Sequence, residues 1–193
     1  MTVAVPAPMR LVVYGDFSCP FSALASSSAA ELERRGVAEV DWRGVEHDTT
    51  IAATGEDIDP QRREDFEREL AEVRILLTAG ELDRLRLPRN RANTRMATET
   101  YAAAPPDARP ALRERFFSAY WLDGLDLNDS RLVEAIGGDR RDGPTVRRWR
   151  DEWSALPQPI VPVMVLPDGY VSRGLGALAR LARMTNDPSE IDG

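Results

Sequence analysis

The stretch that decides the fold lies near the N-terminus and reads Leu11-Val12-Val13-Tyr14-Gly15-Asp16-Phe17-Ser18-Cys19-Pro20-Phe21-Ser22. Its apolar start indicates a short buried strand, and the Gly-Asp pair that follows ends the strand. From Phe21 to Arg35 the chain is rich in Ala, Ser and Leu, which predicts a helix. Cys19, the only cysteine, is therefore expected at a helix N-terminus. Unpaired N–H groups and the helix dipole favour a thiolate there.

The composition excludes several classes of function. The chain has 193 residues and a net charge of −7, which argues against nucleic acid as a partner because phosphate binding needs a basic surface. All 25 basic residues are arginine, so Schiff-base chemistry, a lysine general base and a P-loop lysine are excluded. One cysteine and one histidine cannot form a closed zinc site, so no metal is expected.

The sequence also predicts where the protein resides. Residues 1–9 have neither a basic start nor an apolar core, so we expect no signal peptide. No apolar run approaches the roughly 18 residues that a membrane span needs. A single cysteine allows no disulfide within the chain. These features predict a soluble protein without a membrane partner in a reducing compartment, most simply the bacterial cytoplasm.

Patterns along the chain predict an α/β protein with a helical middle. Apolar and charged residues alternate over Val37–Val45, which predicts a second strand and hence a βαβ unit with a parallel pair. Helical patterns then cover 60–80, where Phe66, Leu70, Val73 and Leu77 share one face, followed by 91–103, 109–122, 129–136 and 144–153. Strands at 163–166 and 170–172 flank a turn, and a helix at 175–184 follows.

The strands at the two ends are expected to join in one sheet, because neither set is large enough to be stable alone. We therefore predict a discontinuous α/β domain made of residues 1–59 and 156–193, and a helical insertion domain made of residues 60–155.

The Cys-Pro-aromatic turn after the first strand resembles that of the DsbA-like branch of the thioredoxin superfamily. The resemblance is strongest to FrnE-type proteins and their relatives, the kappa-class glutathione transferases and 2-hydroxychromene-2-carboxylate isomerases. Further matches follow in the family's order: Asn93-Thr94 with Ala97, Phe116–Tyr120 with an acidic turn to Asp126, Val161-Pro162 before a strand, and Ser172-Arg173-Gly174. The resemblance implies a thioredoxin fold, which is a mixed sheet with flanking helices, interrupted by an all-helical insertion.

The resemblance also implies roles for individual residues. The Val161–Pro162 peptide is expected to be cis and to face Cys19, so that the Val161 backbone can pair with an incoming peptide or thiol. Phe21, in the same turn as Cys19, is assigned to substrate binding. Asn93 and Thr94 would line the cleft and bind polar groups of a substrate, or else cap the helix that follows.

The chain departs from the family's oxidoreductases at Ser22, where they carry the second cysteine of Cys-X-X-Cys. It cannot store two electrons as its own disulfide, and is at best a monothiol version. The Ser22 hydroxyl could donate to the Cys19 thiolate, or it is only a polar residue of the first helical turn. His47 follows the second strand, at the sheet edge expected to hold Cys19. It could stabilise the thiolate or act as a base, or it is a surface histidine.

Three functions remain open at this point. The first is a monothiol thiol–disulfide oxidoreductase in which Cys19 is the nucleophile, Pro162 completes the site, and an external small thiol or a partner protein resolves the mixed disulfide. The second is a transferase or isomerase that binds a small thiol and adds it to an aromatic or unsaturated substrate. The third is a non-enzymatic binding module. No bound cofactor is expected; glutathione or another low-molecular-weight thiol would be the co-substrate, and the resemblance allows a homodimer.

Overall fold

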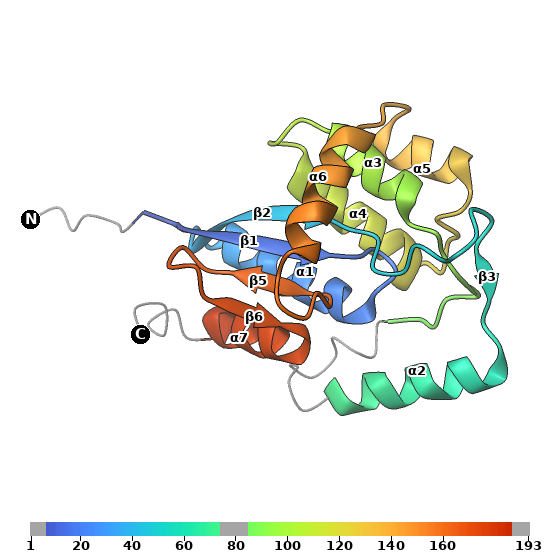
Figure 1. Cartoon of the computed structure of the whole chain (residues 1–193), viewed down its shortest axis with the longest axis horizontal. Helices are drawn as coiled ribbons and strands as arrows, with labels where there is room; N and C mark the ends of the chain where they lie inside the picture. Colours follow the sequence, from blue (N-terminus) through green and yellow to red (C-terminus); the bar gives the residue numbers. More distant parts are fainter. Residues whose placement is uncertain (1–6, 74–84, 187–193) are drawn as a thin grey trace, which may run out of the picture.

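The computed structural model describes residues 7–73 and 85–186, which form a sheet with helices on both of its faces (Figure 1). In chain order the elements are β1 (Met9–Gly15), α1 (Pro20–Arg34), β2 (Ala38–Gly44), β3 (Glu56–Asp57), α2 (Pro60–Val73), β4 (Asn90–Arg91), α3 (Arg95–Ala103), α4 (Arg109–Trp121), α5 (Ser130–Gly137), α6 (Gly143–Ser154), β5 (Val163–Val165), β6 (Val171–Arg173) and α7 (Gly174–Asn186). The predicted extension of α2 to Gly80, with Leu77, lies outside the described residues. Within the described ranges, no helix is long and apolar enough to span a membrane.

The main sheet joins strands from both ends of the chain in the order β2-β1-β5-β6. β1 and β2 are parallel, as the βαβ pattern predicts, whereas β5 pairs antiparallel with both β1 and β6. The expected single mixed sheet is therefore confirmed.

A second sheet of two short strands was not predicted. β3 and β4 pair antiparallel, with Glu56 opposite Arg91 and Asp57 opposite Asn90. This pairing corrects the prediction of a helix over 91–103, because Arg91 is a strand residue and α3 begins only at Arg95. The Asn93 side chain accepts a hydrogen bond from the Arg95 N–H at 3.1 Å, which satisfies one of the free N–H groups at the start of α3.

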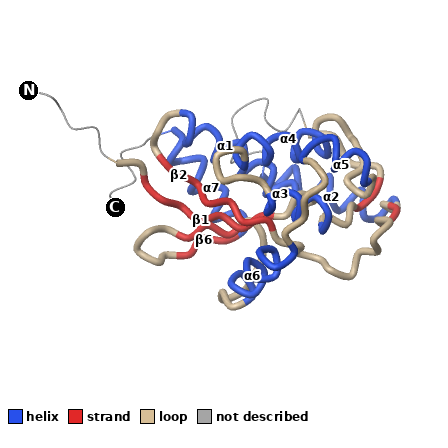
Figure 2. The backbone as a smooth tube through the Cα atoms, turned by 90° about the horizontal axis from the view of Figure 1, so that it is seen from above, coloured by secondary structure: helices blue, strands red, loops and turns tan. Residues whose placement is uncertain are grey.

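The helices form unequal layers on the two faces of the main sheet. Figure 2 shows α6 on one face, opposite the layer that contains α1, α3 and α4. On the α6 face, Glu152 accepts hydrogen bonds from Arg43 and Tyr14 of the sheet. On the other face, the Trp42 ring lies edge-on to Phe117 of α4, with ring centroids 5.6 Å apart.

The turn that carries Cys19 is embedded in an aromatic cluster contributed by the helical segment. Phe17 is 1% exposed, and its ring lies 5.0–5.8 Å from the rings of Tyr101, Phe116 and Phe117. The Trp121 indole N–H donates to the Phe17 carbonyl at 2.9 Å. Thus helices α3 and α4, which are distant in sequence, fix the backbone of the turn.

Candidate active site

Cys19 is the N-cap residue of α1, with Pro20 following in the first helical turn. Its Sγ lies 3.9 Å from the carbonyl oxygen of Val161, to which the thiol donates. The Val161–Pro162 peptide is cis, as the resemblance implied. The preceding residue is held by Trp153 of α6, whose indole N–H donates to the Ile160 carbonyl at 3.2 Å. Residues from the two ends of the chain thus meet at the sulfur.

A cavity of about 270 Å³ opens beside Cys19. Of the residues predicted from sequence, four line this cavity together: Cys19, Phe21, His47 and Val161. The remaining walls come from segments that were not singled out as site residues: Asp16, Ser18 and Pro20 of the turn, Asp48 and Ile51 after β2, Ile58, Arg62, Phe66 and Glu69 around α2, and Pro88, Arg91, Tyr120 and Ile160.

The acidity of Cys19 differs from the expectation for a helix N-terminus. Burial, together with the nearby Asp16 carboxylate, raises the pKa of the Cys19 thiol to about 11. Hydrogen bonds from the Ser22 hydroxyl and from the Ser22 and Phe21 N–H groups lower the pKa, but they do not offset the burial. The expected thiolate is therefore corrected to a thiol that is protonated at neutral pH.

Ser22 occupies the position of the family's second cysteine and is completely buried. Its hydroxyl donates a hydrogen bond to the Cys19 sulfur, the largest of the three interactions that lower the thiol pKa. The same oxygen accepts a hydrogen bond from the Asp16 N–H at 3.2 Å. The hydroxyl therefore links the end of β1 to the sulfur.

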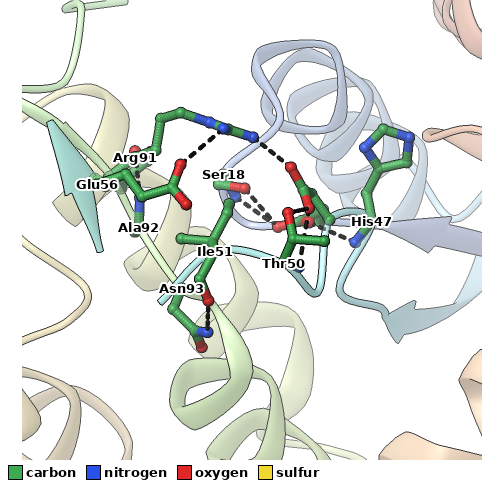
Figure 3. Close-up of polar contacts among 11 residues, drawn as sticks. Ser18, His47, Thr50, Ile51, Glu56, Arg91, Ala92 and Asn93 are labelled. Atoms are coloured by element: carbon green, nitrogen blue, oxygen red, sulfur yellow. Dashed lines mark hydrogen bonds and ion pairs between the residues drawn. The ribbon is translucent and has the colours of Figure 1, made fainter. Parts of the chain in front are cut away.

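Asp16 is the main polar residue of the site that sequence reasoning did not assign. It is 3% exposed, and its carboxylate accepts hydrogen bonds at 2.8–3.0 Å from the Ser18 N–H and hydroxyl, the Thr94 hydroxyl and the His47 N–H. Figure 3 draws the hydrogen bonds of Ser18 and His47 to this carboxylate as dashed lines. The carboxylate joins the Cys19 turn, the loop after β2 and the start of α3. An acidic residue directly after a buried strand was the available signal.

Asn93 and Thr94 are engaged inside the protein. The Thr94 hydroxyl donates to Asp16, and the Asn93 side-chain N–H donates to the Ile51 carbonyl at 2.8 Å (Figure 3). Neither is among the described residues that line the cavity. In this arrangement their side chains hold the loop after β2 and the Asp16 carboxylate. Thr94 is the N-cap of α3 but makes no side-chain cap bond.

Charged side chains at one side of the cavity are already paired. Arg91 forms ion pairs with Asp48 at 2.6 Å and with Glu56 at 3.0 Å (Figure 3). Hydrogen bonds from Thr50 and from Arg91 hold the pKa of Asp48 at about 2. The His47 ring is exposed and lies edge-on to Trp153, with centroids 6.1 Å apart. Among residues 7–73 and 85–186, no group of acidic, His and Cys side chains is arranged to hold a metal ion.

Known proteins were compared with the chain by sequence and by structure. No family model and no curated protein matches the sequence. Among solved structures, 2-hydroxychromene-2-carboxylate isomerase is similar with a TM-score of 0.62 and 18% identity, over 95% of this chain and 96% of that one. A probable DsbA oxidoreductase from Streptomyces coelicolor is similar with a TM-score of 0.65 and 19% identity, over 92% of this chain and 88% of that one.

A third similar structure is a Nitrosomonas europaea protein provisionally described as a protein disulfide isomerase, with a TM-score of 0.53 and 12% identity over 92% of this chain and 97% of that one. All three align over nearly the whole chain, including the helical segment between the two parts of the sheet. The chain therefore has the DsbA-like thioredoxin fold with a helical insertion, the fold that 2-hydroxychromene-2-carboxylate isomerase shares.

Proposed function

We propose that the chain is a thiol–disulfide oxidoreductase that acts through Cys19 alone, with an external small thiol as its co-substrate. The observation that supports this most is the position of the Cys19 sulfur, at the N-terminus of α1, 3.9 Å from the Val161 carbonyl and on the wall of a cavity. Two of the structural neighbours are described as a DsbA oxidoreductase and a disulfide isomerase, which agrees with this chemistry. A reducing cytoplasm would supply the small thiol.

The proposed reaction has two exchange steps. Cys19 first loses its proton to solvent, and the thiolate attacks one sulfur of a disulfide; the S–S bond breaks, and the other sulfur leaves and takes up a proton. The thiolate of an external thiol then attacks the substrate sulfur of the mixed disulfide, and Cys19 leaves and is reprotonated. One half of the original disulfide is released as a thiol, and the other half ends in a new disulfide with the external thiol, while the protein is unchanged.

Residues around Cys19 would support these steps. The Ser22 hydroxyl and the first-turn N–H groups stabilise the sulfur anion, both when it attacks and when it leaves. The Val161 carbonyl accepts a hydrogen bond from the Cys19 thiol in the resting state. Because position 22 is serine, the mixed disulfide cannot be resolved inside the chain, and the second step needs the external thiol.

The test is the rate at which a mixed disulfide of cysteine and glutathione is reduced in the presence of glutathione. Cys19→Ser should abolish the catalysed rate. Ser22→Cys supplies the matched control, because it should allow an internal disulfide that the wild type cannot form. A catalysed rate that survives in Cys19→Ser would contradict the proposal.

A second candidate function is a small-thiol transferase or isomerase. It is favoured because the pKa of Cys19 is raised to about 11. A protonated thiol donates a hydrogen bond as a hydroxyl does, and could stabilise the sulfur of a bound small thiol. This function predicts that glutathione binds by calorimetry and that binding survives in Cys19→Ser. If neither turnover nor glutathione binding occurs, the binding-module alternative remains, and a stable complex with a protein partner would support it.

A further inference from the structure

Helix α2 forms one wall of the cavity beside Cys19. Arg62, Phe66 and Glu69 lie one turn apart on the same face of this helix and line the cavity that Cys19 also lines. The volume of this open cavity, about 270 Å³, lies below the range of about 300–1,000 Å³ for pockets that hold drug-sized ligands. With α2 in this position, the space beside Cys19 suits a small molecule.

Among the side chains of α2 that the structure describes, Phe66 anchors the helix to the rest of the protein. Phe66 is the only buried side chain among those described for α2, and its ring stacks on Trp121 at 5.5 Å with an interplanar angle of 21°. The ion pair that Arg68 makes is internal to the helix, with Asp65. Figure 1 shows α2 at the edge of the molecule, away from the main sheet. Among the described side chains of α2, the main contact with the rest of the protein is therefore that between Phe66 and Trp121.

The two sides of the contact between Phe66 and Trp121 are held by different parts of the protein. Trp121 is 1% exposed and donates to the Phe17 carbonyl, so the ring under Phe66 is fixed to the Cys19 turn. On the other side, the chain enters α2 from β3, which is fixed by pairing with β4 and by the ion pair of Arg91 with Glu56. Loss of the Phe66 contact would weaken the attachment of α2 while both supports stay in place.

We propose that α2, held by the stacking of Phe66 on Trp121, restricts the Cys19 site to low-molecular-weight thiols and disulfides and excludes disulfides carried by folded proteins. Phe66 is then the residue that determines the size of substrate. The inference rests on the proposed function for the reaction at Cys19, whereas the restriction of access is a separate property that labelling measures directly.

The experiment compares two reagents of the same chemistry, N-ethylmaleimide and a maleimide attached to a long polyethylene glycol chain. Because Cys19 is the only cysteine, both label one site. In the native wild type the large reagent should react much more slowly than the small one. Phe66→Ala should raise the rate of the large reagent by about tenfold, the factor that loss of a good aromatic pair gives, and leave the small reagent within about twofold.

Two controls separate access from general loosening of the fold. Glu67→Ala changes an exposed residue of α2 and should leave both rates as in the wild type. Val133→Ala removes buried volume from α5, away from the cavity, and should not change the ratio of the two rates. If Phe66→Ala raises both rates equally, or if the large reagent already labels the wild type as fast as the small one, the proposal is wrong. Should Phe66→Ala not fold, Phe66→Leu must show a smaller rise in the same direction, and no rise overturns the proposal.

Failure of the proposed function would be seen in a different assay. A chain that excludes the large reagent but does not reduce the mixed disulfide would keep the size restriction and lose the oxidoreductase assignment. Turnover through Cys19 with equal labelling by both reagents would keep the oxidoreductase assignment and rule out the size restriction.

Discussion

Cys19 should become reactive only far above neutral pH. Its pKa of about 11 compares with 9.0 for an ordinary cysteine, so near neutrality the thiolate fraction is lower by about a hundredfold. At pH 7 a pKa of about 11 leaves roughly one molecule in ten thousand as thiolate. Since the thiolate is the species that alkylating reagents attack, the native labelling rate should be lower by the same factor.

The assay is the rate of iodoacetamide labelling, measured by mass spectrometry from neutral to strongly alkaline pH on native and on denatured protein. The native midpoint should lie about 2 pH units above the denatured one, because burial of the sulfur outweighs the hydrogen bonds that lower its pKa. A native midpoint at or below the denatured value would refute this reasoning. It would show that the helix N-terminus and Ser22 dominate, as the sequence alone suggested.

The same shift in the pKa of Cys19 makes the stability of the folded protein depend on pH. The folded protein holds the Cys19 proton more tightly than the unfolded chain, so the contribution to stability is fully present below pH 9.0 and is lost as pH rises through about 11. The loss amounts to at most about 2.7 kcal/mol, from about 1.36 kcal/mol for each pKa unit. In urea unfolding, the wild type should therefore lose more stability over this range than Cys19→Ala; an equal loss would contradict the shift.

Three further predictions concern the residues around the site. Asp16→Asn removes a buried carboxylate that accepts four hydrogen bonds, and should lower the free energy of unfolding by about 1–3 kcal/mol in urea titrations; an unchanged value would show that the carboxylate does not hold the three segments together. Gly15→Ala places a Cβ 2.3 Å from Cζ2 of Trp42 and should lower the melting temperature through a cost of about 1–3 kcal/mol, whereas Gly176→Ala, which meets no atom within 4 Å, should not lower it. The depressed pKa of Asp48, about 2, contributes stability above its ordinary value of 3.8 that is lost as pH falls through about 2. Because Asp48 is partly exposed, the loss should be only about 1 kcal/mol, and acid titration of Asp48→Asn should lack it.

Local patterns were sufficient to predict most of the fold. The apolar run of β1, the Ala-rich helix after Cys19 and the alternation in β2 each fix one element over a short stretch, and their order dictates the parallel pair. The hairpin of β5 and β6 likewise has its own turn signal. Each of these elements could be predicted from its own stretch of sequence, because the pattern that stabilises it lies within that stretch.

Features that depend on contacts between distant segments could not be predicted in this way. The pairing of β3 with β4 involves two residues from each strand, and no periodic pattern can form over so short a length. Phe66 could be interpreted as a core residue from its spacing, but not as a cavity wall, because that depends on where α2 lies. The pKa of Cys19 depends on what surrounds the sulfur, whereas the sequence reveals only its place at the start of a helix.

The burial of Phe17 among α3 and α4 has a consequence for how the protein responds to its surroundings. Two positions before Cys19, the backbone is held by the Trp121 indole and the side chain is enclosed by three rings of the insertion. Any event that displaces those helices, such as heating, a bound partner or a core substitution, will shift the sulfur as well. The labelling rate of the Cys19 thiol therefore reports whether this helical layer is intact, although the layer contains no reactive group of its own.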